Sequence, residues 1–327
     1  MQSFGPGNVD CGNITNSYNN TITLNETITV NSTEAEDNQI KQWLSPLEPW
    51  YRHQSVRANL VEGVGDWLVE TNEFREWSGK KGMSKQTVFF CYGHPDVGKT
   101  HIRSVRKLSR KWISLTACNI SSLVIDRLCN QASDKNTAVL GLYCDYLAQG
   151  EQSATNMLGA IFKQLLERGE IPKHLRRAFR EGKKRFGGLA MRLPDLVQVL
   201  KMTIASLSEV FICIDALDEC LPKDQRDLLE SIHEIVLASP TTRLFLTGRP
   251  HIRDKVKGYF TEAITIHFAP TIRDIEGYLE MKLSRDNTPS AMDDDLRAQI
   301  MKVIPGKISP MCVETTISIN QHSARVR

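Results

Sequence analysis

The sequence lacks several features that would direct it to a particular class of protein. Its eight cysteines form no C-x-x-C pair, so we expect reduced, buried thiols and no zinc site. No apolar run is long enough to cross a membrane, and the polar N-terminus has neither the basic nor the apolar region of a signal peptide. The formal net charge of +3 over 327 residues gives no electrostatic reason to expect a nucleic-acid or membrane partner. We therefore expect a cytoplasmic protein.

Residues 1–38 differ in composition from the rest of the chain. They are rich in Asn, Thr, Ser and Gly and poor in basic and large apolar residues. Such a segment buries too little apolar surface to offset the entropy of ordering, so we expect a disordered, low-complexity arm. One alternative stays open. Thr21–Leu24 and Thr27–Val30 alternate threonine with apolar residues, a pattern that also suits cross-β assembly.

The clearest chemical signal is a stretch that fits G-x-x-x-x-G-K-[ST] at every fixed position: Gly93-His94-Pro95-Asp96-Val97-Gly98-Lys99-Thr100. The β-branched and aromatic run Thr87–Tyr92 comes directly before it and predicts a strand. Strand, glycine loop and helix in that order point backbone N–H groups and a positive helix end at a phosphate. We expect Lys99 to reach the β- and γ-phosphates and Thr100 to bind Mg²⁺.

A second signal is the apolar run Val210–Asp215, which ends in a carboxylate and is followed by Ala216-Leu217-Asp218-Glu219. Buried parallel strands are continuously apolar, and ligands bind beyond their C-terminal ends. We expect Asp215 to hold Mg²⁺ through water, and Asp218 or Glu219 to orient or deprotonate the attacking water.

Further apolar runs predict more strands and a third site residue. The expected strands comprise residues 87–92, 138–147, 210–215, 243–247 and 264–268. Arg249 follows the fourth of them, at the same edge as the other two motifs, where a guanidinium could bind the γ-phosphate. The alternative is a surface arginine in a turn.

The remaining segments define the expected domain organisation. A helical lead-in spans 39–85, a nucleotide-binding domain 86–270, a helical subdomain 271–312 and a polar tail 313–327. The lead-in contains Trp43, Trp50, Trp67 and Trp77, for which we prefer packing anchors to a ligand platform. After the phosphate loop, two amphipathic stretches, His101–Leu115 and Ile120–Leu128, compete for the single helix that such a loop needs.

Together these motifs resemble the nucleotide-binding part of fungal NACHT NTPases, also described by a nephrocystin-3-like N-terminal domain, within the STAND class of signalling ATPases. The resemblance runs from about Ile40 to Cys312. Besides the phosphate loop, it depends on Trp43-Leu44-Ser45-Pro46-Leu47-Glu48-Pro49, Phe74-Arg75-Glu76-Trp77, Ile212-Cys213-Ile214-Asp215-Ala216-Leu217-Asp218-Glu219-Cys220 and Thr247-Gly248-Arg249-Pro250-His251-Ile252-Arg253.

The resemblance implies an α/β P-loop NTPase fold with a five-stranded, mostly parallel sheet flanked by helices. It implies ATP or GTP with Mg²⁺, and a switch between a closed and a homo-oligomeric state. ATP is favoured because no N-K-x-D guanine-binding motif follows Asp215. The roles that carry over are phosphate binding by Lys99, metal binding by Thr100 and Asp215, hydrolysis by Asp218 and Glu219, and γ-phosphate sensing by Arg249.

Three departures from the family pattern support an alternative reading. Asp96 stands where the family usually has glycine and places a carboxylate among phosphate oxygens. Residues 102–119 look inserted, which a translated, unspliced intron would explain. Family members continue into further domains, whereas this sequence ends at Arg327. The alternative is therefore a truncated or mis-spliced scaffold without nucleotide turnover.

Overall fold

The computed structural model describes residues 34–58, 62–79, 86–93, 120–132, 136–184, 190–269, 271–284, 294–295, 297–303 and 305. Most of the expected N-terminal arm, residues 94–119 and the polar tail lie outside this part of the chain. The chain divides into two compact units. The smaller comprises Met1–Leu44 and Glu170–Ala190, and the larger comprises Ser45–Gly169 and Met191–Arg327.

Within the smaller unit, an acidic helix over residues 34–44 pairs with the basic helix α7 (Lys173–Lys184). Glu36 accepts hydrogen bonds from the guanidinium groups of Arg176 and Arg180. The rings of Trp43 and Phe179 meet edge to face, with their centroids 5.5 Å apart. Ion pairs at the rim and an aromatic contact inside therefore hold this pair of helices together.

The larger unit is built on a five-stranded sheet in which every pair of neighbouring strands is parallel. The strand order is β2-β3-β4-β1-β5. The strands are β1 (Val88–Tyr92), β2 (Thr137–Tyr143), β3 (Glu209–Asp215), β4 (Thr242–Gly248) and β5 (Ile264–His267). Parallel neighbours require crossover connections, and helices provide them. The expected α/β architecture, a five-stranded parallel sheet flanked by helices, is confirmed.

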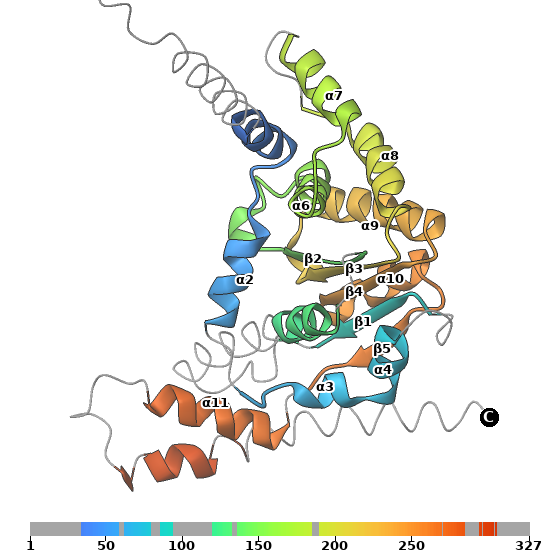
Figure 1. Ribbon diagram of the computed structural model, residues 1–327. Helices are drawn as coiled ribbons and strands as arrows, with labels where there is room; N and C mark the ends of the chain where they lie inside the picture. Colours follow the sequence, from blue (N-terminus) through green and yellow to red (C-terminus); the bar gives the residue numbers. More distant parts are fainter. Residues whose placement is uncertain are drawn as a thin grey trace, which may run out of the picture. The chain divides into compact units, whose positions relative to one another are not determined.

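Helices cover both faces of this sheet (Figure 1). On one face lie α2 (Pro49–Arg57), α3 (Asp66–Glu70), α4 (Asn72–Ser78) and a helix over residues 120–131. On the other lie α6 (Ala154–Leu166), α8 (Leu193–Ile204) and α9 (Pro222–Ala238). The remaining elements are α10 (Arg253–Tyr259), α11 (Ile272–Ser284) and the short 3₁₀ turns η1 (Tyr146–Ala148), η2 (Leu217–Glu219) and η3 (Pro250–Ile252).

Local sequence signals explain where several elements begin and end. Ser153 caps α6 by accepting a hydrogen bond from the backbone N–H of Asn156, and α9 opens with a proline in its first turn. The second strand was expected to run to residue 147, but β2 ends at Tyr143. The reason is Asp145, whose carboxylate accepts from the backbone N–H of Leu147 and thereby starts η1.

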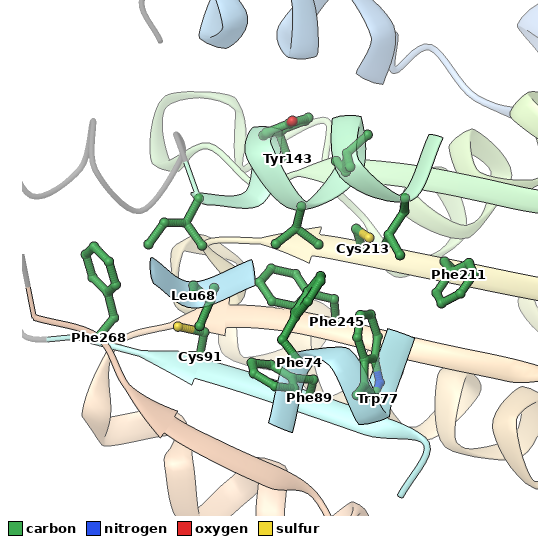
Figure 2. Close-up of a cluster of buried hydrophobic side chains, with 14 of the residues drawn as sticks. Leu68, Phe74, Trp77, Phe89, Cys91, Tyr143, Phe211, Cys213, Phe245 and Phe268 are labelled. Atoms are coloured by element: carbon green, nitrogen blue, oxygen red, sulfur yellow. The ribbon is translucent and has the colours of Figure 1, made fainter. Parts of the chain in front are cut away.

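The core under the first group of helices is aromatic (Figure 2). Trp77 on α4 is fully buried, and its ring lies 5.5 to 6.1 Å from those of Phe74, Phe89, Phe211 and Phe245. Its indole N–H donates to the backbone oxygen of Thr87, so the polar end is also satisfied. Trp77 therefore joins the lead-in helices to strands β1, β3 and β4 as a packing anchor.

A buried lysine fixes the start of the larger unit. Lys163 on α6 is 5% exposed, and its ammonium donates to the backbone oxygens of Ser45 and Leu47 and to the carboxylate of Glu48. The hydroxyl of Ser45 donates in turn to the backbone oxygen of Asn156. The stretch from Ser45 to Glu48 thus docks on α6 through satisfied polar groups.

Candidate functional site

The C-terminal ends of the strands bring the motifs to one edge of the sheet. Tyr92 at the end of β1 pairs with Gly248 at the end of β4, and the N–H of Gly93 donates to the oxygen of Gly248 at 3.3 Å. Asp215 at the end of β3 pairs with Tyr143 on β2. The phosphate-loop pattern therefore begins beside β4, the strand that Arg249 follows, and β3, which carries Asp215, lies on the other side of β4. Its other residues, His94–Thr100, lie outside the described part of the chain, so their roles remain predictions.

Asp215 is almost fully buried, with 1% of its surface exposed, and its two oxygens differ sharply. Oδ1 accepts from the hydroxyls of Ser121 at 2.6 Å and Thr247 at 2.7 Å. Oδ2 has no hydrogen-bond partner among the described residues. An unpartnered buried carboxylate oxygen is costly unless a cation or a proton satisfies it. This oxygen fits the expected role of Asp215 in holding Mg²⁺, which prefers carboxylate oxygen as a protein ligand.

The backbone turns sharply just after Asp215. Ala216 has φ 51° and ψ 46°, a left-handed conformation that costs a non-glycine residue roughly 1–2 kcal/mol. Its N–H donates to the hydroxyl of Thr247 at 2.8 Å. Thr247 therefore holds both the carboxylate of Asp215 and the strained turn that directs the next residues, Asp218 and Glu219.

Asp218 and Arg249 form an ion pair at this edge. The guanidinium Nε lies 2.9 Å from Oδ2 of Asp218, and the N–H of Arg249 donates to Oδ1 at 3.0 Å. Burial raises the pKa of the Asp218 carboxyl above its usual range, and the charge and backbone hydrogen bond of Arg249 oppose that rise. The Arg249 side chain is still 48% exposed. A ligand at this edge of the sheet could therefore reach its guanidinium, as the sequence predicts.

Glu219 is held by the loop after β2. Its Oε2 accepts from the N–H of Tyr146 at 3.1 Å, and its backbone oxygen accepts from the side chain of Gln149 at 2.6 Å. Burial raises the pKa of Glu219, the bond from Tyr146 opposes the rise, and the nearby carboxylates of Asp218, Asp215 and Asp145 add to it. A half-buried carboxyl with a raised pKa is suited to exchange protons with water.

Sequence reasoning missed the two hydroxyls on Asp215. Ser121 and Thr247 are buried, at 0% and 3% exposure, and lie 94 and 32 residues from their partner. One signal was present for Thr247, because a hydroxyl at the end of an otherwise apolar strand faces the same edge as Asp215. Ser121 carried no comparable signal, since Ser122 beside it is equally small and polar.

Residues 118–249 match the family model described as "Nephrocystin 3, N-terminal". This range contains Ser121, Asp215, Glu219 and Arg249. The match and the parallel sheet together support a P-loop NTPase-like domain.

The chain is also similar to a solved structure of the Aeropyrum pernix Orc1 protein in complex with DNA, with 18% identity and a TM-score of 0.41. The alignment covers 86% of this chain and 64% of that one, so the chain spans about two thirds of its length. No curated protein matches the sequence. Among the described helices, none combines the length and hydrophobicity needed to cross a membrane.

Proposed function

We propose that the chain is a nucleotide-binding switch of the NACHT and STAND type, which binds ATP in preference to GTP and hydrolyses it with Mg²⁺. The observation that carries this proposal is the carboxylate of Asp215. It is buried at the C-terminal end of a central parallel strand, with Oδ1 fixed by two hydroxyls and Oδ2 unpartnered among the described residues. A structural aspartate would have both oxygens satisfied, whereas a metal-binding one keeps an oxygen available.

The other site residues take complementary roles in this proposal. Lys99 and the backbone of the phosphate loop bind the phosphates, and Thr100 and Asp215 hold the metal. Bound Mg²⁺ supplies charge neutralisation on the phosphate oxygens. Glu219, with Asp218 beside it, orients and deprotonates the attacking water, while Arg249 binds the γ-phosphate. The family match across residues 118–249 supports the part of this proposal that concerns Asp215, Asp218, Glu219 and Arg249, while Lys99 and Thr100 lie before the matched range.

Hydrolysis in such a switch is coupled to a change in conformation and to homo-oligomerisation. One contact in the larger unit suits such coupling. The buried carboxylate of Asp274 on α11 accepts from the N–H of Gly65, just before α3, and from the N–H and hydroxyl of Thr271. The helical segment after β5 is therefore tied to the lead-in before β1 by a polar contact that can break and re-form.

A second candidate is a scaffold that does not turn over nucleotide. The observation that favours it is Asp96, whose carboxylate would stand among the phosphate oxygens of a bound nucleotide. The family model, moreover, matches only from residue 118, next to the end of the expected insertion at 102–119. Under this second candidate the chain folds but does not bind ATP.

Binding of a fluorescent ATP analogue separates the two candidates. The full chain, its Lys99→Ala variant and a matched Lys201→Ala variant are titrated with and without Mg²⁺, and unlabelled ATP and GTP are compared as competitors. Lys201 on α8 pairs with Glu234 on α9, away from the C-terminal ends of the strands, so its replacement controls for the loss of a positive charge. We expect Mg²⁺-dependent binding that Lys99→Ala abolishes and Lys201→Ala preserves. Absence of binding by a chain whose circular-dichroism spectrum is folded would establish the scaffold instead.

A further inference from the structure

Two cysteine sulfurs meet next to the segments that carry the carboxylates of Asp215 and Glu219. Cys144 follows β2 and Cys220 follows η2, and their Sγ atoms lie 3.1 Å apart. Both side chains are buried, with 3% and 5% of their surfaces exposed. The thioether sulfur of Met157 on α6 lies 3.7 Å from Cys220 Sγ. The pair joins two segments that are 76 residues apart in the sequence.

This sulfur pair is connected to the site through the backbone on both sides. The N–H of Cys144 donates to the backbone oxygen of Asp215 at 3.0 Å. Cys220 comes directly after Glu219, whose side chain accepts from Tyr146, two residues beyond Cys144. The loop after β2 and the turn after β3 are therefore linked by hydrogen bonds at their polar ends and by the two thiols behind them.

We propose that Cys144 and Cys220 form a dithiol modification site that a hydroperoxide converts into a disulfide. A disulfide needs sulfur atoms about 2.05 Å apart, so the two sulfurs have to approach by only about 1 Å. All five described cysteines, Cys91, Cys129, Cys144, Cys213 and Cys220, are free, so the pair starts from two thiols. In a reducing compartment, where the sequence predicts this protein to lie, disulfides are in most cases transient and redox-sensing, which suits a pair placed beside the candidate site.

The chemistry balances with one equivalent of hydroperoxide. The sulfur of one thiol takes the terminal peroxide oxygen and becomes a sulfenic acid, while the O–O bond breaks and an alcohol, or water from hydrogen peroxide, leaves. The sulfur of the second thiol then attacks the first, the S–S bond forms, the S–O bond breaks and water leaves with the thiol proton. The two sulfurs together give up two electrons, and the peroxide accepts them.

The disulfide would constrain the position of Glu219. It would bond the end of β2 covalently to the turn that carries this carboxylate, and would draw the backbone at Cys220 toward Cys144. This consequence rests on the proposed function, because it concerns the residue that activates water there. Misplacing a catalytic group by about 1 Å can cost about a hundredfold in rate, so we expect turnover to fall at least about tenfold on oxidation.

Peptide mapping of the full chain tests the site without reference to nucleotide. The reduced, folded protein is treated with hydrogen peroxide, free thiols are alkylated, and the digest is analysed by mass spectrometry without reduction. We expect a linked peptide pair containing Cys144 and Cys220 to form before any other linkage and to disappear on reduction. The Cys144→Ala variant should not form it, whereas Cys213→Ala, which removes another buried thiol, should form it normally.

The results separate this proposal from the proposed function. Alkylation of both cysteines after peroxide treatment, or their linkage mainly to other cysteines, would overturn the dithiol site, whatever the chain does with nucleotide. The wild-type map decides this even if a variant fails to fold. Formation of the expected disulfide in a chain that never binds ATP would leave the dithiol site standing and remove only its effect on turnover.

Discussion

The guanidinium Nε of Arg249 lies 2.9 Å from Oδ2 of Asp218, while the backbone N–H of the same arginine donates to Oδ1 of the same carboxylate. Two residues expected to serve hydrolysis separately are thus bound to each other. An arginine that binds a γ-phosphate has to share or release this carboxylate. Under the proposed function, the pair would couple the presence of a phosphate to the charge environment of Asp218.

Replacing Arg249 with Gln should expose this coupling in the pH dependence of stability. Burial raises the pKa of Asp218 and the positive charge of Arg249 lowers it. In Arg249→Gln this charge is lost, so the pKa of Asp218 rises further above its value in the unfolded chain. The folded variant then binds a proton that the unfolded chain does not, and its free energy of unfolding falls as the pH rises through that pKa. We expect a loss of about 1 kcal/mol near pH 7, because the arginine is half exposed, shrinking toward acid pH.

Urea unfolding at several pH values measures this effect. Arg226→Gln is the control, since Arg226 pairs with Asp227 on the exposed surface of α9. Its replacement should leave the pH dependence unchanged. A loss in Arg249→Gln that is equal at every pH would show that Asp218 does not respond to the arginine.

Thr247 is expected to position Asp215 for the metal. Thr247→Val removes the donor to Asp215 Oδ1 and the acceptor for the N–H of Ala216, so it should cost about 1–3 kcal/mol of stability. It should also weaken the Mg²⁺ dependence of nucleotide binding, which a merely structural role would not change. Thr247→Ser keeps the hydroxyl and should restore both properties.

A matched control lies on the same strand. The hydroxyl of Thr242 is buried and has no partner among the described residues, so Thr242→Val should be neutral or stabilising. Nucleotide titrations at graded Mg²⁺ concentrations compare the three variants. Equal Mg²⁺ dependence in Thr247→Val and the wild-type chain would argue against the positioning role.

Glu219→Gln should stabilise the fold near neutral pH. Burial raises the pKa of Glu219, so charging it costs more in the folded chain than in the unfolded chain. Between the unfolded and folded pKa values the folded chain holds the extra proton, and stability falls as the pH rises through that window. Glutamine removes this loss and can still accept from the N–H of Tyr146. Thermal unfolding at pH 7 and at about pH 4 should show the gain only at the higher pH.

The exposed Glu230 on α9 supplies the comparison, and Glu230→Gln should change stability little at either pH. If Glu219→Gln is instead less stable than the wild-type chain at pH 7, the hydrogen bonds of the charged carboxylate stabilise the fold by more free energy than its burial costs. Under the proposed function, the same variant should bind nucleotide and fail to hydrolyse it.

Much of the fold follows from local patterns, because each strand is a short apolar run bounded by polar residues. The position of Asp215 at the site follows in the same way, since a carboxylate that ends a buried strand has to emerge at the sheet edge. The predicted end of β2 was wrong because Cys144 and Leu147 continue the apolar run in the sequence. The strand is stopped by the capping side chain of Asp145, and that capping depends on the backbone conformation of this residue. The helix α9, Pro222–Ala238, was not anticipated, although its opening proline is a helix-start signal.

The contacts within the site could not be predicted, because they join residues far apart in the chain. Ser121, Thr247 and Asp215 come together only when the helix over residues 120–131 packs on β3 and β4. The same holds for Cys144 and Cys220, where the sequence indicated buried reduced thiols but not their pairing. Spacing along a chain specifies which face of an element a residue occupies. Which other residue it meets there depends on tertiary packing.

The tryptophans of the lead-in provide a test of core packing against ligand binding. Trp77 is fully buried among four phenylalanine rings, whereas Trp50 on α2 is 56% exposed and stacks on His53. Removing Trp77 leaves a large cavity, and Trp77→Ala should cost about 3–5 kcal/mol, with a smaller loss for Trp77→Phe. Trp50→Ala should cost about 0.5 kcal/mol or less, as for most surface substitutions. Denaturant unfolding gives both values.

A ligand platform would behave in the opposite way. If the lead-in tryptophans bound nucleotide, Trp77→Phe would weaken ATP binding by more than its loss of stability explains, because the remaining folded molecules would lack a contact. The backbone oxygen of Trp77 accepts from the Arg243 guanidinium on β4, and its indole N–H donates to Thr87. Thr87 comes directly before β1 and Arg243 lies near the start of β4, so both polar contacts are at the N-terminal ends of the strands, opposite the candidate site. We therefore expect folded Trp77→Phe to bind nucleotide as tightly as the wild-type chain.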